Sequence, residues 1–424
     1  MTEYNEYKNS GISWIGDIPA HWKIEKGKHI LTLLERTVRD DDEIITCFRD
    51  GEVTLRKNRR EEGFTVSLKE IGYQGIEPGD LVVHGMDGFA GSIGVSDSRG
   101  KATPVLNVMD SNQNKRYLMY YLRTAAYKDV FMSLSTGIRV RSCDLRWNKI
   151  SVFPFILPER EEQDRMVRYI DEKIEHIDIL ISEAKASIEE YKAWKASIIY
   201  EAVTKGLDPN VEMKDSGVDW IGKIPSCWNM MRIKDCAVFM PKVDFSSIRK
   251  DDMITFTPMD CIKNGYFENK GNVFSEIEGS YTPYAEGDIV FAKVTPCFEN
   301  GNAAIMENLF SNVGLGSSEL FVLRAKNIDI KYLFYFIRNK GFIQAATSTM
   351  TGTGGLKRVS SDFVKNAPIP IPCKEEQKKI SNYLDKQCKR IDDLVSEKES
   401  LISDLESYKK SLIFEVVTGK RRVC

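Results

Sequence analysis

Apolar residues recur at alternating three- and four-residue intervals in two long stretches of the chain, residues 158–205 and 372–424. This spacing is the a/d pattern of a heptad repeat, and each stretch keeps it for about five heptads. We therefore predict two helices of about 40 residues, each about 60 Å long. Because such a stripe needs a partner, we expect the helices to pair antiparallel within the chain; a coiled coil between two chains is the alternative. Lys195 and Lys409 occupy equivalent a positions, where polar residues often fix register or orientation.

Outside the heptad stretches, short strand-like runs alternate with turn residues. The segments 77–83 and 285–291 each place a Gly-Asp turn before an apolar strand. One helix is predicted in each half of the chain, at residues 115–123 and 329–338. These parts of the chain are therefore expected to be mixed α/β domains.

Two motifs show that the chain is a tandem duplication. Asn9–Trp22 and Asp215–Trp228 are near copies, and a proline-containing run precedes Glu-Glu-Gln at both 154–163 and 368–377. Their tryptophans, Trp14, Trp22, Trp220 and Trp228, are expected to anchor the domain cores. We predict an α+β fold with a pseudo-twofold internal repeat. Its four parts are a first domain (1–157), a central helix (158–205), a second domain (206–371) and a C-terminal helix (372–424).

Composition excludes few classes of protein. Hydrophobic residues make up 42% and charged residues 29% of the 424 positions, which is typical of a chain with several globular domains. No apolar run approaches the roughly 18 residues that a membrane helix needs, and the acidic N-terminus lacks a secretory pattern. We therefore expect a cytoplasmic protein. A net charge of −2 argues against a simple polyanion binder but permits segregated charge.

The spacing of reactive residues does not indicate catalysis. The four histidines have no metal-ligand spacing with one another or with cysteine. The glycine-containing runs at 88–94 and 352–358 lack the spacing of a nucleotide-binding loop. The sequence therefore favours a binding protein without its own active site, metal or cofactor.

Three basic segments are candidates for contact with nucleic acid. The first is a dense cluster, which we assign to phosphates: Arg56, Lys57, Arg59 and Arg60. The other two are loops whose glycines, hydroxyls and cations suit a close approach to a DNA backbone and base edges. Their candidate residues are Thr136, Arg139 and Arg141 in one loop and Thr353, Lys357 and Arg358 in the other. The alternative for all three segments is an ordinary solvated loop.

The repeated motifs, taken in order, resemble the specificity subunit of a Type I restriction-modification system. They are the Trp-Ile-Gly-x-Ile-Pro frame, the Gly-Asp-Ile/Leu-Val strand, the proline run before Glu-Glu-Gln, and the helix ends at 201–206 and 415–420. The resemblance covers essentially the whole chain, twice. It implies two target recognition domains that each read one half of a bipartite double-stranded DNA sequence, with two helices as a spacer. It also implies a subunit without catalytic activity or cofactor.

The resemblance further implies partners and contact residues. Two adenine methyltransferase subunits, which use S-adenosylmethionine, would dock on the chain, and through them restriction subunits that use ATP and Mg²⁺. Residues 287–302 resemble a recurrent family variant, which places Lys293, Asn300 and Asn302 near DNA; the first domain has His84 in the equivalent place. The alternative function is a coiled-coil adaptor whose two domains bind proteins, and a fused methyltransferase is a third.

Overall fold

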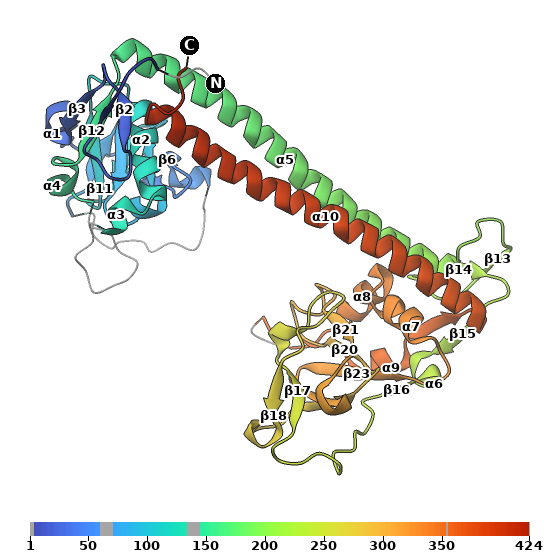
Figure 1. Ribbon diagram of the computed structural model, residues 1–424. Coiled ribbons are helices and arrows are strands. Elements are labelled where there is room, and N and C mark those ends of the chain that lie inside the picture. Colours follow the sequence, from blue (N-terminus) through green and yellow to red (C-terminus); the bar gives the residue numbers. More distant parts are fainter. Residues whose placement is uncertain (1–3, 60–70, 134–144, 353–354, 424) are drawn as a thin grey trace. The chain divides into compact units, whose positions relative to one another are not determined.

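The computed structural model describes residues 4–59, 71–133, 145–352 and 355–423. The chain forms two compact units, one containing residues 1–185 and 399–424 and the other containing residues 186–398. Each unit combines a globular part with a portion of both long helices, α5 (Arg160–Lys205) and α10 (Lys374–Val417) (Figure 1). The predicted mixture of α and β structure is confirmed, and the four-part division of the chain stays a prediction.

The globular part of the first unit is built on a four-stranded antiparallel sheet in the order β4-β11-β8-β9. Four strand pairs surround it: β1 with β2, β3 with β12, β5 with β6, and β7 with β10. The strands are β1 (Tyr7–Asn9), β2 (Asp17–Pro19), β3 (Lys23–Lys26), β4 (Thr32–Leu33), β5 (Ile45–Cys47), β6 (Val53–Leu55), β7 (Gln74–Ile76), β8 (Leu81–His84), β9 (Ile93–Val95), β10 (Gly100–Ala102), β11 (Leu106–Asp110) and β12 (Pro154–Leu157).

The central strand β8 begins directly after the predicted Gly-Asp turn. Gly79 has φ 87°, a conformation that favours glycine, and Asp80 Oδ2 accepts a hydrogen bond from the Glu77 amide at 2.8 Å. The strand is buried on both faces. Leu81 and Val83 lie in the core beneath helix α2 (Lys115–Tyr127), whereas alternating residues such as Val82 lie in a second, smaller core.

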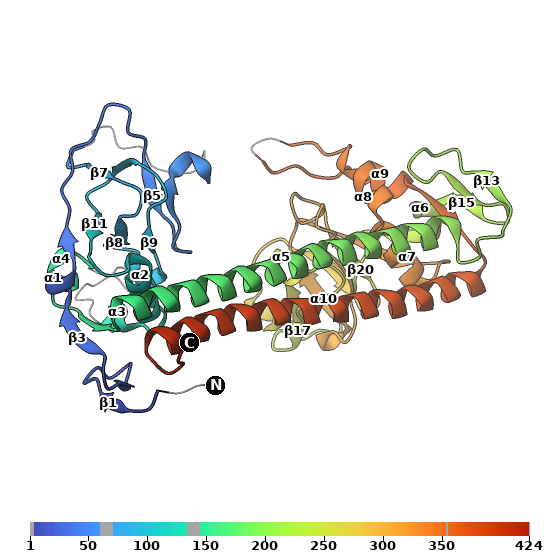
Figure 2. The same cartoon turned by 90° about the horizontal axis from the view of Figure 1, so that it is seen from above.

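The helices of the first unit are short, apart from α2 and the portions of α5 and α10. Asn114 caps α2 by accepting hydrogen bonds from the Arg116 and Tyr117 amides, which confirms the helix predicted at this place. In Figure 2, α2 lies beside β8, β9 and α5. The remaining helical segments are α1 (Gly27–Ile30), α3 (Val130–Ser133), α4 (Trp147–Ile150) and the 3₁₀ turns η1 (Arg56–Asn58) and η2 (Gly88–Ala90).

The second unit repeats the first sheet and adds another. The sheet β16-β23-β20-β21 is antiparallel, and β20 also follows a Gly-Asp turn, in which Asp288 accepts from the Ala285 amide at 2.8 Å. A second sheet, β18-β17-β22-β19, contains the parallel pair β17 and β22. The strands are β13 (Met213–Asp215), β14 (Lys223–Pro225), β15 (Asn229–Arg232), β16 (Ala237–Phe239), β17 (Met253–Thr257), β18 (Gly271–Val273), β19 (Thr282–Ala285), β20 (Ile289–Ala292), β21 (Ala303–Ile305), β22 (Val313–Gly316), β23 (Leu320–Ala325) and β24 (Pro368–Ile371).

Helix α7 (Ile330–Ile337) confirms the second predicted short helix. Its N-cap is Asp329, which accepts from the Tyr332 amide, and α7 packs against β21 and β23 of the repeated sheet. The other helical segments of this unit are α6 (Ile233–Cys236), α8 (Lys340–Thr347), α9 (Ser361–Asn366) and the 3₁₀ turns η3 (Met259–Cys261), η4 (Phe274–Glu276) and η5 (Phe310–Asn312).

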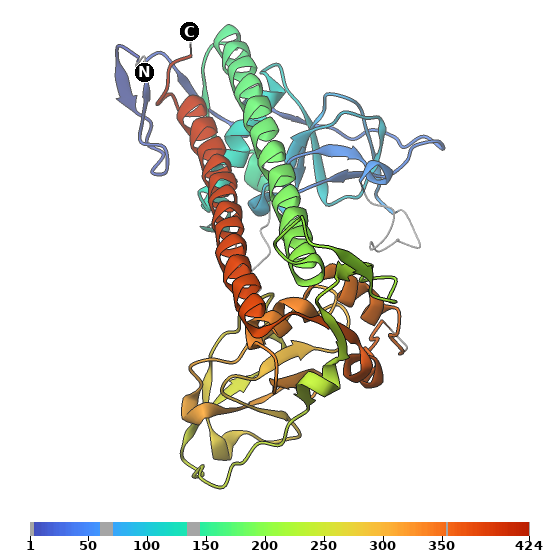
Figure 3. The same cartoon turned by 90° about the vertical axis from the view of Figure 1, so that its right-hand side faces the viewer.

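The two long helices are confirmed at 46 residues for α5 and 44 for α10. Neither contains glycine or proline, and both carry two glutamates in the first turn, where negative charge stabilises a helix. Every predicted a and d position is buried or half-buried. The helices pack together, as Figure 3 shows. They share one core in the first unit, through Ile177 and Leu412, and another in the second unit, through Ala202 and Leu384.

The duplicated motifs make the same contacts in both units. Trp22 and Trp228 are fully buried, and their indole N–H groups donate to Glu162 at 3.2 Å and Glu376 at 3.0 Å. Trp14 and Trp220 are half-buried and pack against the same cores. The predicted role of these tryptophans as domain anchors is therefore confirmed, and the glutamates of the two Glu-Glu-Gln motifs are their partners.

A tyrosine in each unit ties its short helix to a strand, β12 or β24, and to the C-terminal end of one long helix. In the first unit, the Tyr117 hydroxyl can donate to two backbone carbonyls, that of Ile156 at 2.9 Å and that of Val417 at 3.3 Å. In the second unit, Tyr332 is placed in the same way against Pro370 at 2.8 Å and Val203 at 3.1 Å. Matching hydrogen bonds therefore occur in the two units at corresponding tyrosines.

Candidate nucleic-acid interface

The predicted basic cluster of the first unit surrounds the short hairpin β5–β6, and acidic neighbours offset much of its charge. Lys57 Nζ lies 2.6 Å from Glu43, and Arg59 lies 2.6 Å from Asp50. The Asp50 carboxylate raises the pKa of Arg59, so this guanidinium stays charged. Arg56 donates to Thr46 Oγ1 at 3.2 Å. Arg60 lies outside the described residues. The phosphate groups of a nucleic acid would have to compete with these carboxylates for the basic side chains.

His84 ends strand β8 and holds the turn that follows. Its Nδ1 accepts from the amides of Met86 at 3.2 Å and Asp87 at 2.9 Å, which assigns the proton of the neutral ring to Nε2. Burial lowers the pKa of His84 and favours this neutral form. The first unit therefore has an uncharged imidazole at the end of β8, whereas the second unit has Lys293 directly after the end of β20.

The first candidate loop, with Thr136, Arg139 and Arg141, lies outside the described residues. The described chain resumes at Leu145, which forms hydrogen bonds close to His84. The Leu145 amide donates to the Gly85 carbonyl at 2.8 Å, and Asn107 Nδ2 donates to the Leu145 carbonyl at 2.8 Å. Leu145 is therefore hydrogen-bonded to the turn that follows β8.

In the second unit, the structure brings Lys293 together with the loop that ends in Arg358. The Val359 amide donates to the Lys293 carbonyl at 2.9 Å, and the Thr295 amide donates to the Lys357 carbonyl at 3.0 Å. Thr295 Oγ1 also accepts from the Lys357 amide at 3.0 Å. Two segments about 60 residues apart, each predicted separately, therefore form one edge. Thr353 lies outside the described residues.

One carboxylate, that of Glu319, lies between the two main cations of this edge. Arg358 donates to both of its oxygens, at 2.8 and 2.7 Å, and Lys293 Nζ lies 3.9 Å from it. The Arg358 hydrogen bond lowers the pKa of Glu319. Lys293 also donates to the Ser318 carbonyl at 2.7 Å. Lys357, by contrast, forms no ion pair with any residue that the structure describes. The edge is therefore a preorganised charge cluster in which Glu319 offsets part of the positive charge.

Asn300 and Asn302 lie in the compact loop between β20 and β21. Backbone hydrogen bonds close this loop: the Asn300 amide donates to Pro296 at 3.0 Å, and the Asn302 amide donates to Cys297 at 3.1 Å. Asn264 Nδ2 donates to the Asn300 carbonyl at 2.8 Å. In the described part of the chain, neither side-chain amide of Asn300 or Asn302 has a hydrogen-bond partner. Both are therefore available to an external ligand.

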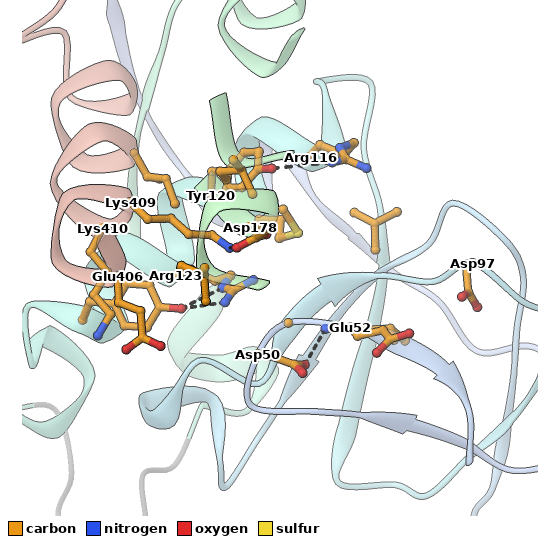
Figure 4. Close-up of a pocket in the computed structure, with 18 of the residues that line it drawn as sticks. Asp50, Glu52, Asp97, Arg116, Tyr120, Arg123, Asp178, Glu406, Lys409 and Lys410 are labelled. Atoms are coloured by element: carbon orange, nitrogen blue, oxygen red, sulfur yellow. Dashed lines mark hydrogen bonds and ion pairs between the residues drawn. The ribbon is translucent and has the colours of Figure 1, made fainter. Parts of the chain in front are cut away.

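A groove of about 760 Å³ in the first unit is chemically different from these edges (Figure 4). It lies between α2, α5, α10 and the β5–β6 turn, and Lys409 pairs with Asp178 across it at 2.7 Å. Five acidic and five basic side chains line it: Asp50, Glu52, Asp97, Asp178 and Glu406, with Arg116, Arg123, Lys185, Lys409 and Lys410. Because the charges balance, this groove is a poor candidate for a polyanion.

Two further observations bear on the class of protein. Within the described ranges, His, Cys, Asp and Glu side chains form no group of three that could hold a metal ion. Among the described residues, no helix has both the length and the apolar character needed to cross a membrane.

Residues 225–403 match the family model of the Type I restriction modification DNA specificity domain. The chain is 30% identical over 216 residues to the Type I restriction enzyme EcoEI specificity subunit of Escherichia coli, and 33% identical over 202 residues to the EcoAI specificity subunit of the same organism. These matches cover 50% and 46% of this chain, but only 36% and 34% of the relatives, so the chain spans about a third of their length.

The fold is also similar to a solved structure. A chain from a structure of the type I R-M system, described in terms of complex assembly and conformational transition, aligns with a TM-score of 0.69 at 13% identity. The alignment covers 94% of this chain and 98% of the other. The family match is limited to residues 225–403, where it supports the resemblance found in the repeated motifs, and the likeness in fold extends over nearly the whole chain.

Proposed function

We propose that this chain, whose residues 225–403 belong to the Type I restriction modification DNA specificity domain family, is the DNA-recognition subunit of a Type I restriction-modification complex. One observation carries the proposal: the two units repeat the same frame but present different chemistry at the same place. Trp22 and Trp228 make equivalent contacts, whereas β8 ends in a neutral His84 and the chain after β20 begins with Lys293. A shared frame with unlike edges suits a bipartite target with two different half-sites.

Recognition would divide between contacts that position the protein and contacts that read bases. In the second unit, Lys293, Arg358, Asn300 and Asn302 are the proposed readers, because arginine and lysine pair with guanine and asparagine pairs with adenine. In the first unit, His84, Thr136, Arg139 and Arg141 have this role. The cluster at Arg56, Lys57, Arg59 and Arg60 would bind phosphates, which adds affinity without sequence preference. Thr353 and Lys357 would anchor the second loop on the backbone.

The long helices would act as the spacer between half-sites. The contacts of Lys195 and Lys409 with carboxylates support an antiparallel coiled coil with pseudo-twofold symmetry. We propose that the chain has no catalytic activity or cofactor of its own and works in the cytoplasm. Two adenine methyltransferase subunits that use S-adenosylmethionine, and restriction subunits that use ATP and Mg²⁺, would supply the chemistry.

A binding experiment tests the function. The full chain would be assembled with the methyltransferase subunit encoded beside it and titrated with random and genomic duplexes in gel-shift assays. A recognition subunit selects a subset of genomic fragments that share a bipartite motif. An adaptor that binds only proteins shows no preference among duplexes, and this result would contradict the proposal.

A further inference from the structure

Arg338, at the C-terminal end of α7 in the second unit, has a guanidinium that is held on three sides. Its Cζ lies 4.6 Å from the centre of the Phe334 ring. A Cβ placed on Gly265 would lie 3.1 Å from its Nη2, so the guanidinium packs directly on that backbone. Asn264 Oδ1 accepts a hydrogen bond from Nη2. The geometry fixes this cation before any ligand arrives.

No carboxylate among the described residues pairs with Arg338. Its Nε is buried and has no hydrogen-bond partner there. Burial lowers the pKa of Arg338, which shows that the charged form is poorly solvated. Other arginines of this unit differ: Arg324 donates to both oxygens of Asp288, at 2.7 and 2.8 Å. A half-buried cation that forms no ion pair with a described carboxylate marks a place where an anion would be stabilised.

Two adjoining cavities, of about 390 and 460 Å³, are both lined by Arg338, Asn264 and Lys195. Lys195 and Lys331 are already paired, with Asp392 and Asp385 respectively, each at 2.6 Å. Lys340 and Lys389 add positive charge, and Glu299 and Glu307 are the remaining acids. The cavities therefore keep a net positive charge around Arg338, in contrast to the balanced groove of the first unit.

We propose that these cavities form a binding site for a phosphate group, with the Arg338 guanidinium as its main ligand. A planar fork of N–H donors matches the oxygens of a phosphate group, and the charge of both partners strengthens the hydrogen bonds. Asn264 links the site to the candidate interface, because its side chain also donates to the Asn300 carbonyl at 2.8 Å. The phosphate would come from the DNA backbone or from a free phosphorylated molecule, and only the first source rests on the proposed function.

The first test uses inorganic phosphate and the full chain. Thermal unfolding is measured in phosphate and in chloride at equal ionic strength for wild type, Arg338→Gln, Arg338→Lys and the control Arg232→Gln. Arg232 already pairs with Asp235 at 2.9 Å on the surface. We expect phosphate to raise the unfolding midpoint of wild type and the control by about 2 °C or more, and that of Arg338→Gln not at all. Arg338→Lys should keep part of the shift, and ³¹P line broadening gives the same comparison without unfolding.

The second test separates the sources. Duplex binding by the chain assembled with its methyltransferase is measured at several salt concentrations. If DNA supplies the phosphate, Arg338→Gln weakens binding to cognate and mismatched duplexes alike, by about tenfold, and lowers the salt slope by about 0.9.

A lost phosphate response with an unchanged salt slope supports the site and assigns it to a free phosphorylated molecule. If Arg338→Gln changes neither readout while wild type still binds cognate DNA, the site is refuted and the proposed function stands. If wild type shows no duplex preference, the proposed function fails and the phosphate response alone decides the site.

Discussion

Lys195 Nζ lies 2.7 and 2.6 Å from the two carboxylate oxygens of Asp392, on the facing long helix of the second unit. Lys409 makes the same contact with Asp178 in the first unit, at 2.7 Å to both oxygens. The side chains of these lysines are 19% and 29% exposed, and both occupy a positions of the heptad pattern. A partner carboxylate at each position supports the idea that these lysines select one register of the helix pair.

A double-mutant cycle on Lys195→Met and Asp392→Ala should give a coupling energy of about 0.5–1 kcal/mol, because the lysine is largely buried while the aspartate is exposed. Urea unfolding of the full chain provides the measurement. The matched control is the exposed ion pair of Lys192 with Glu189, at 2.9 Å within α5. Its coupling energy should be about 0.3 kcal/mol. Equal coupling in the two cycles would count against a register role.

Acid should remove a specific stabilising contact in the first unit. Arg99 donates to both oxygens of buried Asp42, at 2.8 and 2.7 Å, and this lowers the pKa of Asp42 to about 2. Because the folded pKa is below the unfolded value of about 3.9, the contribution is complete above about pH 4 and disappears as pH falls through about 2. Asp42→Asn should therefore cost about 2 kcal/mol of unfolding free energy at pH 7 and progressively less below pH 4. Asp40→Asn, an exposed change in the same loop, should cost little at either pH.

Removing Glu319 should increase affinity for DNA while reducing selectivity. Glu319→Gln frees Arg358 and Lys293 from a competing carboxylate, so binding to unrelated duplexes should strengthen and the salt slope should rise. Arg358→Ala should instead relax preference at one base position by roughly ten- to a hundredfold. Titrations on cognate and single-mismatch duplexes distinguish the two. If both variants give the same titration curves as wild type, this edge does not contact DNA.

The two units should exchange independently. Replacing residues 230–366 with the matching segment of a relative should change one half of the methylated motif and leave the other half intact, because the frame contacts of Trp228 and Tyr332 are repeated in the first unit. Methylome sequencing of cells that carry the hybrid reads both halves at once. A simultaneous change in both halves would show that the units do not read separately.

Local pattern was sufficient for much of the fold. The heptad spacing predicted α5 and α10, since helix periodicity is expressed within a few turns and neither stretch contains a glycine or proline. The Gly-Asp turns before β8 and β20 were equally readable, because the aspartate side chain bonds an amide only three residues away. The repeated motifs predicted that the tryptophan anchor occurs twice, and the contacts of Trp22 and Trp228 agree.

Sequence alone determined the two long helices, the two short helices and the two Gly-Asp turns, whereas tertiary structure decided which charges are available. In the sequence, no acidic residue next to Arg358 or Lys293 indicates an ion pair. In the folded chain both lie beside Glu319, which is 39 residues from Arg358. Arg338 read as a helix end, yet in the folded chain it is half-buried and its Nε is buried without a described hydrogen-bond partner. The physical reason is that a helix or turn is set by neighbours in sequence, whereas desolvation and ion pairing depend on residues that only the folded chain brings within a few ångströms.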